Sequence, residues 1–204
     1  MVGDSLQGHE KRAISSTREG WLLRINDIIL YMKKLIFILG ASGSGKTTNV
    51  KNIENKYSDK YHFAYFDQPR VPSVEEVQEK HGGWENWGVE RTNDWVKKIK
   101  ENYIEDRVTI FDVHTKPQNI ENACNDFGII DYVVILLDCS DDERKNRLIE
   151  RGQPHLINDS LFEWALFLRD EAVKRDYIVI ENTGLTIEDG LKKVEDKVEE
   201  LSKS

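Results

Sequence analysis

The stretch LIFILGASGSGKTTNV, residues 35–50, joins an apolar run to a loop that is almost bare of side chains. The run LIFIL is apolar on both faces of an extended chain, which predicts a strand buried on both sides. It ends at Gly40, after which only Ala, Ser and Gly occur until Lys46 and Thr47. A helical pattern follows. The stretch therefore predicts a strand, a loop with an accessible backbone, and a helix.

Residues 40–47 of this loop match the pattern G-x-x-x-x-G-K-[ST]. Glycines let backbone N–H groups curl around a phosphate without Cβ clashes, and the helix N-terminus adds partial positive charge. Lys46 is placed to bridge the outer phosphates, and the Thr47 hydroxyl to ligate Mg²⁺. The alternative is a glycine-rich turn that happens to contain a lysine, which the flanking strand and helix disfavour. We therefore predict that a nucleoside triphosphate is bound through its phosphates by Gly40, Ala41, Ser42, Gly43, Ser44, Gly45, Lys46, Thr47 and Thr48.

Strands and helices are predicted to alternate along the chain from residue 32 onward. Apolar runs rich in β-branched and aromatic residues predict strands at 34–40, 61–67, 108–113, 132–139 and 177–182. Helical patterns predict helices at roughly 45–57, 91–105, 117–127, 141–151, 159–175 and 186–202. Because most strands are apolar on both faces, the alternation predicts a three-layer α/β domain with a covered parallel sheet. Residues 68–90 carry only a weak pattern.

The chain of 204 residues is expected to form a single domain. Its polar, unpatterned start leads us to expect that residues 1–31 are an N-terminal extension outside the core domain of residues 32–204. The alternative is an amphipathic helix packed on the domain, since Leu22, Ile25 and Ile29 share a helical face.

Composition and charge narrow the range of partners. The chain has 29 Lys and Arg against 37 Asp and Glu, whereas a surface for a nucleic-acid polymer usually shows a basic excess. No apolar run reaches the length of a membrane span. Cys124 and Cys139 lack metal-site or CxxC spacing, which is typical of reduced thiols. We therefore predict a cytoplasmic protein without a nucleic-acid or membrane partner.

The loop ILGASGSGKTT and the five alternating strands resemble the small-molecule kinases of the P-loop superfamily. These are the nucleoside and nucleotide kinases, with shikimate, gluconate and chloramphenicol phosphotransferases as relatives. The resemblance covers residues 32 to about 201 and is specific for the phosphate loop and the organisation. It implies a five-stranded parallel sheet of order 2-3-1-4-5, a mobile lid that carries arginines, and ATP as phosphoryl donor to a small-molecule acceptor.

Two aspartates end predicted strands at the sheet edge where ligands bind in open α/β folds. The resemblance implies that Asp67, after the second strand, contacts the acceptor and acts as a catalytic base; the alternative is that it caps the following loop. Asp112 ends the third strand in the form of a Walker B element, which predicts that it holds Mg²⁺ together with Thr47. Several small-molecule kinases lack a firm Walker B, so another placement of the metal stays open.

Three arginines follow the fourth strand at helical spacing, and the chain then turns at Gly152 and Pro154. The resemblance implies that residues 144–158 form the lid, with Arg147 and Arg151 as catalytic residues that bind phosphate oxygens in pairs. The alternative is a solvated helix face with i,i+4 ion pairs. For Arg144 we expect that solvated face.

Segment 68–104 is expected to bind the acceptor by its position. Arg70 and Trp87 are the predicted substrate-binding residues, together with Asp67, whereas Trp95 is expected to belong to a small helical core. After the fifth strand, the resemblance places Asn182 and Thr183 beside the adenine. The predicted acceptor is a nucleoside or a nucleotide.

The predicted function is therefore an ATP-dependent kinase of a small molecule. The alternative is an ATP-binding regulatory or adaptor protein that transfers no phosphoryl group to a small molecule. A guanine switch is disfavoured, because no N-K-x-D follows a strand and no D-x-x-G occurs. Asp67 and the lid arginines favour the kinase, since a switch needs no acceptor pocket.

Overall fold

A computed structural model describes residues 34–102 and 107–203 of the chain. The predicted extension, residues 1–31, lies outside the described residues. Strands and helices alternate in the order β1 Leu35–Leu39, α2 Lys46–Tyr57, β2 His62–Tyr65, α3 Val74–His81, α4 Trp84–Asn102, β3 Thr109–Asp112, α5 Pro117–Asp126, β4 Tyr132–Asp138, α6 Asp141–Glu150, the 3₁₀ helix η1 Pro154–Leu156, α7 Asp159–Lys174, β5 Ile178–Glu181 and α8 Ile187–Lys203.

The strands of the described chain form one parallel sheet in the order β2-β3-β1-β4-β5. This confirms the predicted α/β fold and its strand order. Asp112 of β3 pairs in register with Ile38 of β1 on one side and with Tyr65 of β2 on the other. The carboxyl ends of these three strands therefore meet at one edge, which brings the segments that follow them side by side.

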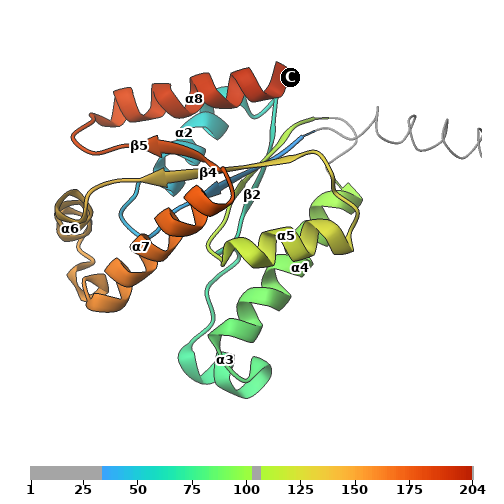
Figure 1. Ribbon diagram of the computed structural model, residues 1–204, viewed down its shortest axis with the longest axis horizontal. Coiled ribbons are helices and arrows are strands. Elements are labelled where there is room, and N and C mark those ends of the chain that lie inside the picture. Colours follow the sequence, from blue (N-terminus) through green and yellow to red (C-terminus); the bar gives the residue numbers. More distant parts are fainter. Residues whose placement is uncertain (1–33, 103–106, 204) are drawn as a thin grey trace, which may run out of the picture. The chain divides into compact units, whose positions relative to one another are not determined.

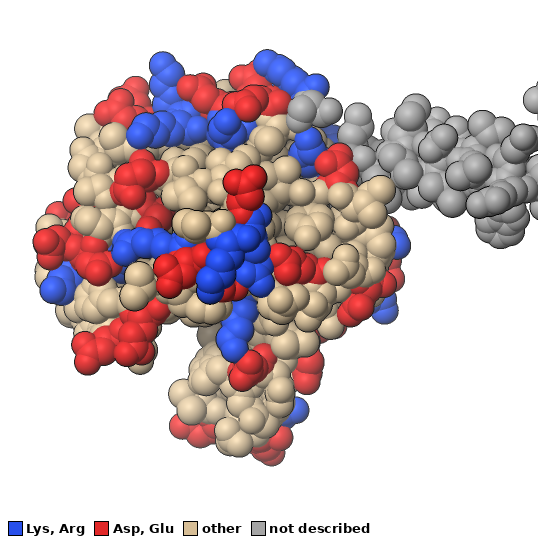
Figure 2. Space-filling view, in the orientation of Figure 1, with Lys and Arg blue, Asp and Glu red and all other residues tan. Residues whose placement is uncertain are grey.

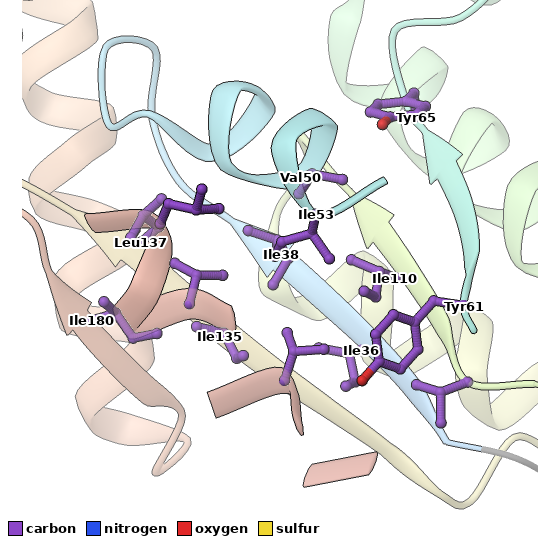
Figure 3. Close-up of a cluster of buried hydrophobic side chains, with 14 residues drawn as sticks. Ile36, Ile38, Val50, Ile53, Tyr61, Tyr65, Ile110, Ile135, Leu137 and Ile180 are labelled. Atoms are coloured by element: carbon purple, nitrogen blue, oxygen red, sulfur yellow. The ribbon is translucent and has the colours of Figure 1, made fainter. Parts of the chain in front are cut away.

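Each face of the sheet is covered by helices (Figure 1). On one face, side chains such as Ile36 and Ile38 pack in a cluster with Val50 and Ile53 of α2, and the cluster extends to α8 (Figure 3). Because side chains alternate along a strand, Phe37 points to the opposite face. α4, α5 and α7 cover that face, and no water reaches the LIFIL strand from either side.

Residues 68–90, which carry only a weak pattern in the sequence, contain α3 and the first turns of α4. α3 begins after Ser73, whose hydroxyl accepts a hydrogen bond from Glu76 N while the Glu76 carboxylate accepts one from Ser73 N. This capping box was readable in the sequence as S-x-x-E. α3 ends at Gly82, which has a φ of 71°, and α4 then starts at Trp84 and not at the predicted residue 91.

α3 and the first turns of α4 extend away from the sheet as a helical hairpin (Figure 1). His81 Nδ1 and Glu90 Oε2 lie 2.6 Å apart across it. α4 was predicted too short because GGWENWG contains three glycines and no helical periodicity of apolar residues. In the folded protein, the contacts within the hairpin outweigh the low helix propensity of these glycines. Among the described helices, none combines the length and apolar character that crossing a membrane requires.

Candidate functional site

The predicted phosphate loop runs from the end of β1 into the first turn of α2. Gly45 is the N-cap of α2 and has a φ of 93°, a backbone conformation that residues other than glycine rarely adopt. At Gly40 a Cβ would lie 2.4 Å from the carbonyl oxygen of Leu137, so the loop passes too close to β4 for any side chain. The glycines of the pattern thus serve both the turn and the packing of the loop against the sheet.

Arg144 holds this loop by a hydrogen bond to its backbone, and the prediction that Arg144 lies on a solvated helix face is wrong. Its side chain is fully buried rather than on a solvated face. The guanidinium donates to the carbonyl of Ser42 at 2.9 Å and to Asp138 Oδ1 at 2.7 Å. Arg169 of α7 pairs with the other oxygen of Asp138, and this hydrogen bond raises the pKa of Arg169. A buried guanidinium requires such partners, which helical spacing alone does not reveal.

Lys46, Thr47 and Asp112 meet at the carboxyl edge of the sheet. The Thr47 hydroxyl donates to Asp112 Oδ2 at 2.5 Å, and Lys46 Nζ lies 3.4 Å from Asp112 Oδ1. Asp112 Oδ1 is buried and has no hydrogen-bond partner among the described residues. A carboxylate and a hydroxyl are hard oxygen ligands, and Mg²⁺ usually takes one or two of these plus substrate phosphates. The residues present therefore fit Mg²⁺, although no group of three or more His, Cys, Asp or Glu in the described chain forms a metal cage.

A cavity of about 500 Å³ lies between the phosphate loop, α6 and the segment from β5 to α8; we call it the loop cavity. Arg147 Nη2 donates to the carbonyl of Asn182 at 2.8 Å, and Asn182 Nδ2 donates to the carbonyl of Ser44 at 3.0 Å. These bonds join α6 and the segment after β5 to the phosphate loop. The cavity wall is formed by Gly43, Gly45, Thr48, Asn49, Glu143, Arg147, Glu150, Arg151, Asn182, Leu185, Thr186, Ile187 and Gly190.

Another cavity, of about 410 Å³, lies beside the end of β3, between α4 and α7. We call it the tryptophan cavity. Its wall is formed by Trp84, Glu85, Trp87, Gly88, His114, Thr115, Lys116, Asn119 and Trp164. Figure 2 shows the surface hollowed between the α3–α4 hairpin and the part of the domain that carries α7.

His114 lies in the wall of the tryptophan cavity, beside the end of β3. Its ring is half-buried and lies 5.7 Å from the ring of Trp164, centroid to centroid. Burial lowers the pKa of His114 to about 4, and the nearby charge of Lys46 acts in the same direction, against that of Asp112. The imidazole is therefore neutral at pH 7. His114 follows Asp112, the last residue of β3, by two positions, so the tryptophan cavity lies beside the strand end that carries the predicted metal ligand.

Solved structures with the same architecture include several small-molecule kinases. Deoxyadenosine kinase from M. mycoides with bound dATP is 16% identical with a TM-score of 0.56, over 81% of this chain and 99% of that chain. A gluconokinase from Sinorhizobium meliloti 1021 is 16% identical with a TM-score of 0.53, over 82% and 96%. A sugar kinase from Janibacter sp. HTCC2649 is 18% identical with a TM-score of 0.51, over 79% and 92%. The chain has the fold of the P-loop small-molecule kinases.

The likeness in structure is not accompanied by a match over the whole sequence. No protein-family model matches the chain, and no curated protein matches it. At the identities found, the likeness to solved kinases establishes the fold.

Around the loop cavity, the structure brings together most of the residues that were predicted to bind the nucleotide and its phosphates. Arg147, Arg151 and Asn182 line the loop cavity with the glycines of the phosphate loop. Thr183 does not line it, because its hydroxyl accepts a hydrogen bond from Ser140 N at 2.7 Å and donates to the Glu181 carboxylate. Sequence reasoning missed Leu185, Thr186, Ile187 and Gly190, since the start of α8 carries no binding pattern of its own.

On the other side, the predicted residues are spread more widely. Trp87 lines the tryptophan cavity, with its ring 5.4 Å from that of Phe66. Asp67 is exposed in the turn after β2. Arg70 is also exposed and donates two hydrogen bonds of 2.6 Å to the carboxylate of Glu76, away from the cavity wall.

Sequence reasoning missed several residues of the tryptophan cavity. His114, Thr115 and Asn119 come from the segment VHTKPQN after β3, which matches no binding pattern, and Trp164 lies on α7, far along the chain. A polar segment directly after a buried strand was the available signal, because ligands bind at this edge.

Proposed function

We propose that this protein is a kinase that transfers the γ-phosphoryl group of ATP to a hydroxyl of a small molecule. The observation that carries the proposal is a pair of separately walled cavities near the carboxyl edge of the sheet, the loop cavity beside the phosphate loop and the tryptophan cavity beside the segment that follows β3. Gly43 and Gly45 line the loop cavity, whereas His114, two residues after Asp112, lines the tryptophan cavity. An ATP-dependent switch needs a nucleotide cavity and no enclosed space beyond it.

In this proposal the loop cavity holds the nucleotide and the loop backbone holds its phosphates. Lys46 neutralises charge on the outer phosphates, and the amides of residues 43–47 donate hydrogen bonds to them. Thr47 and Asp112 would hold Mg²⁺, which neutralises charge that develops on the phosphoryl oxygens.

Arg147 and Arg151 are proposed to contact the phosphoryl group during transfer. Arg147 is already anchored by Glu143 at 2.9 Å and by Asn182, and its Nη1 is 3.4 Å from the carbonyl of Ser44. Arg151 caps the C-terminus of α6, is exposed and borders the loop cavity, so it has freedom to move inward. Guanidinium groups suit this task because they bind phosphate oxygens in pairs.

Asp67 is proposed to orient the acceptor hydroxyl and to receive its proton. It lies just past Tyr65, which pairs in register with Asp112, and Phe66 N donates to the Asp112 carbonyl at 2.9 Å. Asp67 therefore follows the same sheet edge as the predicted metal ligand. Replacement by Asn should leave ATP affinity unchanged and reduce turnover by roughly 10²-fold or more, since general-base catalysis contributes that much.

The test is acceptor-dependent ATP consumption by the full chain, with nucleosides, nucleotides, sugars and sugar acids as acceptors. Lys46→Met should reduce turnover by about 10²-fold or more, because it removes a charge that stabilises the transition state. Lys51→Met is the matched control, since Lys51 lies on the same helix and is exposed. Tight ATP binding without turnover on any acceptor would contradict the kinase and support the regulatory or adaptor function.

A further inference from the structure

Aromatic rings dominate the wall of the tryptophan cavity. Trp84 and Trp87 of α4 pack edge to face with ring centroids 5.3 Å apart, and Trp164 comes from a different helix, α7. Trp84 is 46% exposed, so part of its side-chain surface is accessible to a ligand. Indole faces bind flat rings by stacking, whatever the ring's hydrogen-bonding groups are.

The uncharged polar part of the wall includes an amide that is only partly paired. Asn119 is buried, and its Nδ2 donates to Thr115 Oγ1 at 2.9 Å. Its Oδ1 accepts no hydrogen bond from the described residues, so the amide has an acceptor available. Gly88 of α4 faces the same pair: a Cβ there would lie 3.7 Å from Asn119 Nδ2. The missing side chain leaves space beside the amide.

The charged residues of the cavity wall are already paired with each other. Among its described wall residues, Glu85 and Lys116 carry charge at pH 7, and they form an exposed ion pair of 2.6 Å with each other. Both arginines of the described segment 68–102 are also engaged, Arg70 with Glu76 and Arg91 with the carbonyls of Phe66 and Gln68. A phosphate or carboxylate on the acceptor would find no unpaired cation in the wall, whereas anion sites are normally built around one.

We propose that the tryptophan cavity binds an uncharged acceptor with a flat aromatic ring and a free hydroxyl, such as a nucleoside, in preference to a nucleotide or a sugar acid. The inference rests on the proposed kinase function and narrows its acceptor. In the reaction the acceptor oxygen bonds to the γ-phosphorus as the bond to the bridging oxygen breaks. ADP leaves, and the hydroxyl proton passes to the Asp67 carboxylate.

The test is equilibrium binding to the full chain by calorimetry, with nucleosides, their 5′-monophosphates and gluconate as probes and without ATP. Nucleosides should bind at least about tenfold more tightly than the other two, in line with the value of base–aromatic stacking. Trp84→Ala should weaken nucleoside binding by roughly tenfold. Val89→Ala, at another exposed position on α4 outside the cavity wall, should leave it unchanged.

A second variant tests the charge argument by gain of binding. Glu85 has a side chain that is 75% exposed, so Glu85→Gln should not affect folding, and it releases Lys116 at the cavity wall. Monophosphate binding should then improve by roughly two- to fivefold, the range expected of an exposed charge pair, while nucleoside binding stays constant. Unchanged monophosphate binding would count against the charge argument.

The outcomes separate this inference from the proposed function. If a monophosphate or gluconate binds more tightly than any nucleoside and is phosphorylated, the inference is overturned and the kinase stands. If nucleosides bind in a Trp84-dependent manner and no acceptor is phosphorylated, the kinase is overturned and the cavity assignment stands. If none of the probes binds, the inference is overturned.

Discussion

At the scale of single residues, Asp112 is the group on which the proposed phosphate and metal chemistry would depend most directly. Its carboxylate accepts a hydrogen bond from Thr47 at 2.5 Å and lies 3.4 Å from Lys46 Nζ. Asp112→Asn keeps the shape of the side chain and removes the charge that Mg²⁺ would need. We expect turnover to fall by roughly 10²-fold or more.

Magnesium titration of ATP binding measures the same effect without turnover. In the wild type, Mg²⁺ should strengthen ATP binding, and in Asp112→Asn this strengthening should be largely lost. Asp126→Asn, at the exposed C-terminal end of α5, is the control. An unaltered magnesium response in Asp112→Asn would place the metal elsewhere.

His114 predicts a specific pH dependence of stability. The folded pKa of about 4 is below the ordinary value of about 6.5, so between these values only the unfolded chain holds the proton. Stability should therefore fall as the pH falls from about 6.5 to about 4, by at most about 3 kcal/mol from this group.

His114→Phe keeps a ring beside Trp164 and removes the titration. Urea unfolding in metal-free buffer should then show a smaller loss of stability between pH 6.5 and 4 than the wild type shows. His155→Gln, in the exposed 3₁₀ helix η1, should behave like the wild type. Equal pH slopes in wild type and His114→Phe would show that the ring is protonated in the folded protein as readily as in the unfolded one.

The positions of individual residues could be predicted from sequence where a motif requires one residue type for one backbone geometry. The phosphate loop is such a case, because a Cβ at Gly40 would clash with the backbone of β4 and Gly45 has a positive φ that other residues rarely adopt. Arg144 is the opposite case. It shares helical spacing with Arg147 and Arg151, yet it is buried against Asp138. Burial depends on how α6 packs on the end of β4, and no local pattern contains that information.

At the scale of elements, α3 is held by a short capping box, and this predicts a localised effect on the acceptor side. Ser73→Ala removes the hydroxyl that accepts from Glu76 N, which should cost about 1 kcal/mol in α3 stability. Because α3 packs on α4, which carries Trp84 and Trp87, we expect a raised KM for the acceptor and an unchanged KM for ATP. Amide exchange should increase in residues 74–81.

Ser160→Ala is the matched control for this change. Ser160 is exposed in the first turn of α7, where the cap is supplied by Asn158. It should change neither KM nor the exchange of α3. A change in the ATP KM of Ser73→Ala would show that α3 also affects the nucleotide side.

Elements were predictable to the extent that their burial is uniform. β1, β3 and most of β4 are continuous apolar runs buried on both faces, so their positions and their parallel arrangement followed from sequence. α4 begins within the stretch GGWENWG, at Trp84, where glycine and tryptophan obscure the helical period, and its start was missed. Apart from Trp87, the wall of the tryptophan cavity was not predicted, because it joins α4 to α7 and to residues after β3, which are distant in sequence.

At the scale of the whole domain, one buried charge cluster links elements that are distant in sequence. Asp138 ends β4, Arg144 lies on α6 and Arg169 on α7, and Arg144 also donates to the carbonyl of Ser42 in the phosphate loop. Removing one partner of a buried ion pair is costly because the other charge and the carbonyls lose their compensation. The loop that is predicted to bind phosphate therefore depends on the same contacts as the fold.

Arg144→Met tests this link between stability and nucleotide binding. We expect the free energy of unfolding to fall by about 3 kcal/mol, less than the upper range for buried pairs because Arg169 still compensates Asp138. Lys174→Met removes an exposed ion pair with Glu171 on α7 and should cost well under about 1 kcal/mol. Urea unfolding of both variants measures the difference. If the cluster also positions the phosphate loop, the folded Arg144→Met protein should bind ATP more weakly than the Lys174→Met protein. Equal ATP affinity would limit the cluster to a structural role.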